Sequence, residues 1–143
     1  MEFLIGEQFP DKVIPLINEA KKSIQIIVFE WIWYPNNNTK SIQLFNQSIV
    51  RARNRGVNIE VVANSMPIVK VLNELNIKAR KLSTRKLIHS KVMIIDEKDV
   101  VIGSHNYTQN AFTSNFEVSV YIKEAENIKT LLTHFNYLYN LSA

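Results

Sequence analysis

The sequence predicts an α/β fold, an α/β/α sandwich in which helices cover both faces of a central mixed β-sheet. Segments with apolar residues at helical spacing alternate along the chain with short segments rich in β-branched residues, as in layered α/β domains. The second half ends in consecutive strands, which adds antiparallel pairs to the sheet. At 143 residues, 46% of them hydrophobic, the chain can build one contiguous core. We therefore expect a single domain over residues 1–143.

The first half of the chain contains two helical patterns, each followed by a strand. The expected elements are a helix over 11–22, a buried strand over 23–29, a helix from Thr39 or Ser41 to Arg55, and a strand over 57–63. The segment 23–29 is too short for a typical helix and is rich in β-branched residues, which favour strands. Gly56 follows the second helix and supplies its stop signal.

The second half contains shorter elements and a hairpin. The expected elements are a short helix over 68–75, a short strand over 77–82, strands over 91–95, 100–102 and 116–122, and an amphipathic helix over 124–141. A polar four-residue turn joins the first two strands of the hairpin. Ile95 should therefore face Val100, and residues near 103 should lie opposite His89.

Composition excludes several kinds of site. The chain has no cysteine, which excludes disulfides, thiolate metal sites and a cysteine nucleophile. Seventeen Lys and Arg residues against thirteen Asp and Glu residues give a net charge of +4, which suits a polyanionic partner. The N-terminus lacks the charge of a secretory signal, and the longest apolar stretch, 24–34, is too short to span a bilayer. We expect a soluble cytoplasmic protein with no stable membrane association.

Polar side chains converge at the start of the hairpin. His89 and Lys91 are two residues apart in an extended segment, so they should project to the same side. Asp96 falls at the end of that strand, where the turn could fold it back toward the same site. Ser104 and Asn106 follow the neighbouring strand and should lie beside His89 and Lys91. An imidazole, an ammonium, a hydroxyl and an amide together suit the binding of a phosphate.

These residues resemble the signature of the phospholipase D superfamily: His, any residue, Lys, four residues, Asp, then Gly-Ser-any-Asn and a later acid. The matching residues are His89, Lys91, Asp96, Gly103, Ser104, Asn106 and Glu117. The resemblance extends over most of the chain, but its diagnostic part is confined to residues 89–117. It implies a phospholipase D-like fold and a phosphodiesterase that needs no metal and no cofactor.

The resemblance also implies a role for each residue. His89 would attack phosphorus and form a phosphohistidine that water resolves. Lys91, Asn106 and Ser104, beside Gly103, would bind the non-bridging oxygens. Glu117 would accept a hydrogen bond from a catalytic histidine and fix its tautomer. Asp96 would support the site through Lys91 or through backbone amides.

The chain has one copy of the motif, whereas the family uses two. Two-fold pairing of identical chains would place His89 and its symmetry mate on opposite sides of one phosphate, so the resemblance implies a homodimer. His105 is the alternative acid within the chain, although it occupies the variable position of its motif. His134 is expected to be an ordinary residue of the last helix.

The resemblance does not identify the substrate. Because small family members with a single motif most resemble bacterial endonucleases, we expect a nucleic-acid substrate, DNA in preference to RNA. The candidate contacts are Arg85 and Lys86 with Lys81, the cluster Arg51, Arg53 and Arg55, and the aromatic residues Trp31, Trp33 and Tyr34. The aromatic residues could equally belong to the core or to a dimer interface. Two other functions stay open: a phospholipase or phosphatidyltransferase, and a non-catalytic nucleic-acid-binding module.

Overall fold

The computed structural model describes residues 1–37 and 39–143, and these form a mixed β-sheet flanked by helices. Within these residues the sheet has seven strands in the order β1-β7-β6-β5-β2-β3-β4. The strands are β1 (Glu2–Ile5), β2 (Ser23–Val28), β3 (Asn58–Ala63), β4 (Lys78–Lys81), β5 (Lys91–Ile95), β6 (Asp99–Gly103) and β7 (Val118–Ile122). The helices are α1 (Gln8–Glu19), α2 (Ser41–Asn54), α3 (Met66–Glu74), α4 (Gln109–Thr113) and α5 (Ile128–Asn140). The predicted α/β class is confirmed.

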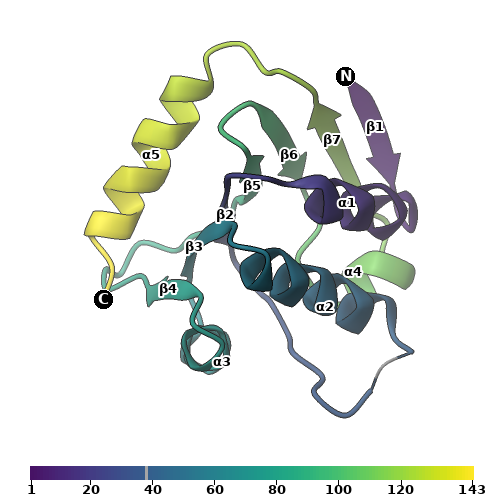
Figure 1. Cartoon of the computed structure of the whole chain (residues 1–143), viewed down its shortest axis with the longest axis horizontal. Helices are drawn as coiled ribbons and strands as arrows, with labels where there is room; N and C mark the ends of the chain where they lie inside the picture. The colour runs from purple at the N-terminus through teal and green to yellow at the C-terminus, as the bar shows by residue number, and fades with distance from the viewer. Residues whose placement is uncertain (38) are drawn as a thin grey trace.

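The sheet separates two apolar cores. Ile24, Ile26 and Val28 of β2 point toward the core that contains α1, α2 and α4, whereas Ile27 points toward α5. Figure 1 shows α1 and α2 side by side and α5 separate from them. Strand β2 is buried along its whole length, with Ile24, Ile26 and Val28 on one face and Ser23, Gln25 and Ile27 on the other. None of the helices that the structure describes is long and apolar enough to cross a bilayer.

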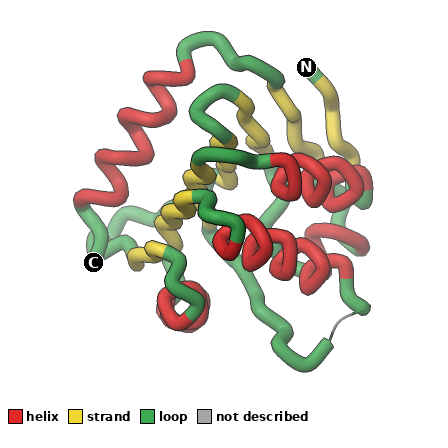
Figure 2. Tube along the Cα trace, in the orientation of Figure 1, coloured by secondary structure: helices red, strands yellow, loops and turns green. Residues whose placement is uncertain are grey.

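The pairing within the sheet changes direction at β5. Strands β2, β3 and β4 are parallel, while β5 runs antiparallel to β2 and begins an antiparallel series through β6 and β7 to β1. The last residues of the chain return to β4, where the Lys81 amide donates to the Ala143 carbonyl at 2.9 Å (Figure 2). This contact keeps the end of α5 close to the segment that follows β4.

Several sequence-based boundaries need correction. Strand β1 and helix α4 were not expected. The N-cap of α2 is Lys40, without a side-chain cap from Thr39 or Ser41, although Gly56 ends this region with a left-handed φ of 99° as expected.

The predicted hairpin register was also wrong, because Ile95 pairs with Asp99 and Lys91 with Gly103. The turn is tighter than four residues because Asp96 and Glu97 both have positive φ, 54° and 56°.

The Asp96 carboxylate anchors this turn to the start of β2. It accepts hydrogen bonds from the amides of Lys21, Lys22 and Ser23, the shortest at 2.7 Å. Burial raises the pKa of Asp96, but these three amide donors and the Lys98 charge outweigh that effect and hold the pKa below its ordinary value. Asp96 therefore fixes the turn in its left-handed conformation and the position of β5 against β2.

His105 joins β1, β6 and β7 inside the other end of the sheet. Its Nε2 lies 2.9 Å from the Gly6 carbonyl and its Nδ1 lies 2.7 Å from the Ser119 hydroxyl. Since a carbonyl can only accept, Nε2 carries the proton and Nδ1 accepts from Ser119. The ring is fully buried and stacks on Phe9 with centroids 4.4 Å apart. Burial lowers the pKa of His105 against the opposing effects of the Gly6 carbonyl and Glu117.

Replacement of Asp96 should destabilise the fold. Asp96→Ala leaves three amides without their acceptor at a position of positive φ, so the free energy of unfolding should fall by about 2 kcal/mol. Asp96→Asn, which tolerates this φ and keeps one acceptor oxygen, should lose less. Because the folded pKa is depressed, the contribution is present above about pH 4 and should disappear as the pH falls through the folded pKa. Urea unfolding from pH 6 to pH 2 measures this; equal acid sensitivity in Asp96→Asn and wild type would contradict it.

The buried His105 should make stability depend on pH at a higher range. The unfolded state takes up a proton on the His105 ring below about pH 6.5, whereas the folded state binds that proton only at lower pH. The free energy of unfolding should therefore fall as the pH is lowered from 7 to 5. His105→Gln should lower stability at pH 7 by about 2 kcal/mol and flatten this dependence. An NMR titration of the wild-type ring provides the second readout, and a pKa at or above 6.5 would refute the assignment.

Candidate active site

Several of the predicted site residues lie at one edge of the sheet. The carboxyl ends of β2, β3 and β6 and the amino ends of β5 and β7 meet there, because β5 runs antiparallel to both β2 and β6. We call this the carboxyl edge. His89 precedes β5, Asn106 follows β6, and Glu117 precedes β7. Ligand sites in open α/β sheets commonly form where the strand direction or order changes.

We call the point of the carboxyl edge where β5 begins, between the chains that leave β2 and β6, the notch. Beyond Lys91, the chains that leave β2 and β6 pair directly: the Tyr107 amide donates to the Glu30 carbonyl and the Ile32 amide to the Tyr107 carbonyl, both at 3.0 Å. The Glu30 amide donates to Oδ1 of Asn106 at 3.1 Å. This bond fixes the orientation of the Asn106 amide, so its Nδ2 remains available to donate to a ligand.

His89 and Lys91 both lie near one aromatic ring, that of Phe29. The exposed His89 ring has its centroid 5.5 Å from that of Phe29, and the Lys91 ammonium lies 5.9 Å from the same Phe29 centroid. Both side chains thus lie near the same ring at the start of β5. Phe29 itself was missed, although its place at the end of a buried strand was a signal.

The Lys91 side chain is nearly buried without an acidic partner. It is 7% exposed, and the described part of the chain gives it no hydrogen bond and no ion pair. Its one polar contact is the face of Phe29, which attracts a cation weakly. A poorly hydrated ammonium without a counter-ion is costly, so an anion that binds here gains a strong partner.

Glu117 is held by two neighbours at the same edge. The Ser104 hydroxyl donates to Oε1 at 2.6 Å, and the Asn115 amide donates to Oε2 at 3.0 Å. The Ser104 oxygen in turn accepts from the Val118 amide at 3.0 Å. The Ser104 proton is thus engaged with Glu117 rather than free for a phosphate. Among the residues described, no hydrogen bond joins Glu117 to His89.

Gly103 is required by packing between strands. A Cβ at this position would lie 2.3 Å from both Cα and Oγ of Ser119, its partner in β7. Any larger side chain would displace Ser119 and with it the bond to His105. The structure therefore explains this glycine without a contact to substrate.

Two groups of predicted residues lie away from the notch. Asp96 is at the opposite end of β5 and supports the turn through backbone amides, not through Lys91. The basic cluster at the end of α2 lies near the amino ends of β2 and β3 and serves the fold. Arg51 donates to Oδ1 of Asn18, and Arg53 donates to the Asn76 carbonyl. Arg55 donates to the carbonyls of Ile17 and Ala20. The cluster, which was one candidate for nucleic-acid contacts, therefore lies at the other end of the sheet from His89.

The remaining candidates divide between the core and the surface. Trp31 is buried, and its Nε1 donates to Asn46 Oδ1 at 2.7 Å, so it is a core residue. Trp33 and Tyr34 are partly buried against the same core. Arg85 and Lys86 are exposed on the segment between β4 and β5. Within residues 1–37 and 39–143, no three His, Asp or Glu side chains cluster so that they could hold a metal ion.

Comparison with known proteins matches most of the chain to one family. The family model described as "Cardiolipin synthase, PLD-like domain" matches residues 13–139. The probable cardiolipin synthase YwiE of Bacillus subtilis (strain 168) is 28% identical over 139 residues, covering 90% of this chain and 26% of YwiE. The chain thus spans about a quarter of that relative.

Solved structures share the fold. Nuc from Salmonella typhimurium, a phospholipase D family member, superposes with a TM-score of 0.83 at 23% identity, covering 99% of this chain and 96% of Nuc. TrmBL2, an archaeal chromatin protein that binds DNA, has a TM-score of 0.67 at 19% identity, covering 99% of this chain and 52% of TrmBL2. At these identities the two structures support the fold alone. The match over residues 13–139, together with the order and spacing of the motif residues, shows that the chain belongs to the phospholipase D superfamily.

Proposed function

We propose that this protein is a metal-independent phosphodiesterase that hydrolyses nucleic acid, DNA in preference to RNA. The observation that carries the proposal is the exposed His89 imidazole near the nearly buried Lys91 ammonium, which has no ion pair among the residues that the structure describes. The free Nδ2 of Asn106 adds a second donor at the same notch. A nucleophile next to two donors for non-bridging oxygens suits attack on a phosphodiester.

The reaction proceeds in two displacements. A nitrogen of the His89 ring attacks phosphorus, the bond from phosphorus to the leaving oxygen breaks, and that oxygen takes a proton. Water then attacks the phosphohistidine, gives up a proton to a base, and releases His89. Lys91 and Asn106 stabilise the charge on the non-bridging oxygens in both steps, a role that metal ions fill in other phosphoryl-transfer sites.

One chain provides half of this site. The leaving oxygen needs an acid, and His105 cannot serve because it is buried with both ring nitrogens engaged. In a two-fold homodimer, the partner's His89 supplies that proton. Glu117, held by Ser104 and Asn115, is then placed to accept a hydrogen bond from a catalytic histidine across the interface.

An exposed apolar surface on β1 and at the start of β7 suits this pairing. Phe3 and Ile5 of β1 are 66% and 61% exposed, Val118 of β7 is 53% exposed, and Phe116 is fully exposed. Ile5 pairs with Val118, and Phe116 and Val118 flank Glu117 in sequence. We call these four residues the β1–β7 face. Adjacent exposed apolar side chains commonly mark an interaction surface.

Two observations favour nucleic acid over lipid. The net charge is +4, and Arg85 and Lys86 are exposed next to His89. Weak support comes from TrmBL2, which shares the fold and binds DNA. Phosphatidyl transfer is the second candidate, because the matching family and YwiE are described as cardiolipin synthases. A non-catalytic DNA-binding module is less consistent with a nearly buried Lys91 near His89 that has no ion pair within the described part of the chain.

The mechanism predicts which changes abolish cleavage. With excess EDTA, the purified protein should cleave plasmid and single-stranded DNA, and His89→Ala should lower the rate by at least about 10³-fold. Lys91→Ala should lower kcat by about 10²- to 10³-fold, because it removes a donor to the transition state. Lys98→Ala, at the other end of the hairpin, is the matched control and should keep the wild-type rate.

The same assay is run with RNA and with phosphatidylcholine as substrates. The variant Asp96→Asn is assayed as well, to test whether the Asp96 carboxylate acts in the active site. Cleavage that needs a metal ion, or that survives His89→Ala, would refute the mechanism. Cleavage of phosphatidylcholine with intact DNA would replace nuclease activity by the lipid alternative.

The dimer predicts that assembly and activity are lost together. Phe116→Asp or Val118→Asp puts charge on the β1–β7 face and should convert the dimer to a monomer with at least about tenfold lower activity. Leu44→Asp changes an exposed apolar residue of α2 and should alter neither. Analytical ultracentrifugation measures the mass. A wild-type protein that cleaves DNA as a monomer would contradict the shared site.

A further inference from the structure

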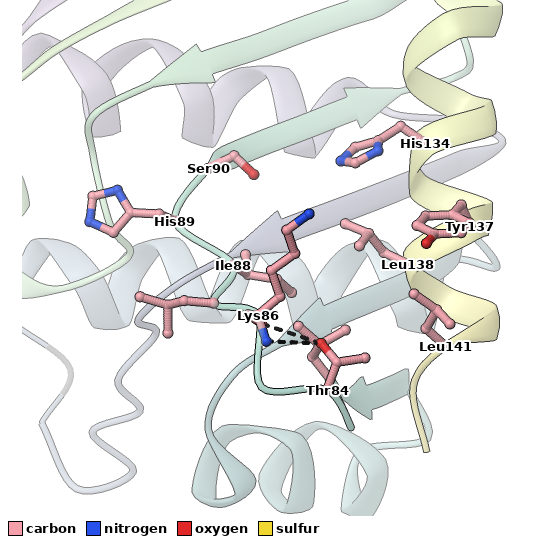
Figure 3. A pocket seen from close by; sticks show the side chains of 11 residues that line it. Thr84, Lys86, Ile88, His89, Ser90, His134, Tyr137, Leu138 and Leu141 are labelled. Atoms are coloured by element: carbon pink, nitrogen blue, oxygen red, sulfur yellow. Dashed lines mark hydrogen bonds between the residues drawn. The ribbon is translucent and has the colours of Figure 1, made fainter.

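A cavity lies between α5 and the segment that carries His89, and His89 is among the residues that line it. It occupies about 360 Å³ between residues 82–90 and α5 (Figure 3). Leu82, Ile88, Leu138 and Leu141 form its apolar wall. Cavities of this size accept small planar or aliphatic groups. We call it the α5 pocket.

The rim of the α5 pocket is polar and carries no acid. Lys86, Ser90 and His134 line it, and none of its lining residues is Asp or Glu. In Figure 3 the Lys86 side chain extends from the loop toward the space between Ser90 and His134. Lys86 has no ion pair within the described residues. The rim is therefore suited to an anionic group beside an apolar one.

Two flat rings project over the pocket from α5. His134 and Tyr137 are three residues apart and thus share one face of the helix. Tyr137 is 61% exposed, so its ring is accessible rather than part of the core. Exposed aromatic rings beside basic side chains provide stacking surfaces for nucleobases.

The short segment that carries the reactive ring also forms part of the pocket lining, through His89 and Ser90. Figure 3 shows the His89 ring directed away from α5, whereas Ser90 faces the pocket side. A chain whose phosphate reaches His89 at the carboxyl edge can therefore place its neighbouring unit against α5. The pocket is too small for both acyl chains of a phospholipid, and its basic rim favours a second phosphate.

We propose that the α5 pocket binds the nucleobase next to the scissile phosphate, with Tyr137 as its stacking surface and Lys86 on the adjoining phosphate. This inference rests on the proposed nuclease function and assigns a substrate role to α5.

Binding measurements separate the base from the backbone. Fluorescence anisotropy compares a labelled oligothymidylate with an abasic tetrahydrofuran oligomer of equal length, in the His89→Ala protein so that neither probe is cleaved. Tyr137→Ala should weaken oligothymidylate binding about tenfold and leave the abasic oligomer unchanged, since stacking on one base is lost. Tyr137→Phe keeps the ring and should restore affinity. Lys86→Ala should weaken both oligomers, and Lys129→Ala, a lysine of α5 outside the pocket, neither.

Three results would overturn the proposal. The first is that the protein does not bind oligothymidylate, and the second is that Tyr137→Ala changes the affinity for both oligomers equally. The third is that Tyr137→Ala abolishes binding of short-chain phosphatidylcholine but leaves oligothymidylate binding intact. The last would assign the pocket to an acyl chain. Failure of the nuclease function is a separate result, seen as intact DNA in the cleavage assay, and the binding measurement decides the role of the pocket in either case.

Discussion

The alternation of side chains along β5 is the constraint on which the site depends. Lys91 pairs with Gly103 and shares its side of β5 with Met93 and Ile95, which lie in the core of α1 and α2, whereas Val92 and Ile94 lie in the core of α5. A shift of one residue would exchange these sides. The Lys91 side chain would then face α5 instead.

Buried polar groups hold this register from both ends. Asp96 fixes the turn against β2 through three amides, and His105 joins β1, β6 and β7 close to the notch. Neither requires contact with substrate. Gly103 belongs to the same system, because its lack of a side chain admits Ser119, which positions His105. Part of the motif therefore supports the sheet, and His89, Lys91 and Asn106 are left to act on a ligand.

The sequence predicted features that depend on local spacing. The strands, the closeness of His89 and Lys91, and the meeting of residues 103–106 with them follow from period-two alternation and a short turn. It did not predict β1, an edge strand whose partner is far away in sequence, or the hairpin register, which depends on positive φ at Asp96 and Glu97. The partners of Glu117 and the α5 pocket depend on docking between distant segments, which no local pattern encodes.

The central claim is a covalent intermediate on His89, and the stereochemistry at phosphorus tests it most directly. A phosphorothioate diester of known configuration is hydrolysed in oxygen-18 water, and the configuration of the product is determined. Two successive in-line displacements, first by His89 and then by water, predict overall retention. Inversion would show that water attacks phosphorus in one step, and it would contradict His89 as the nucleophile.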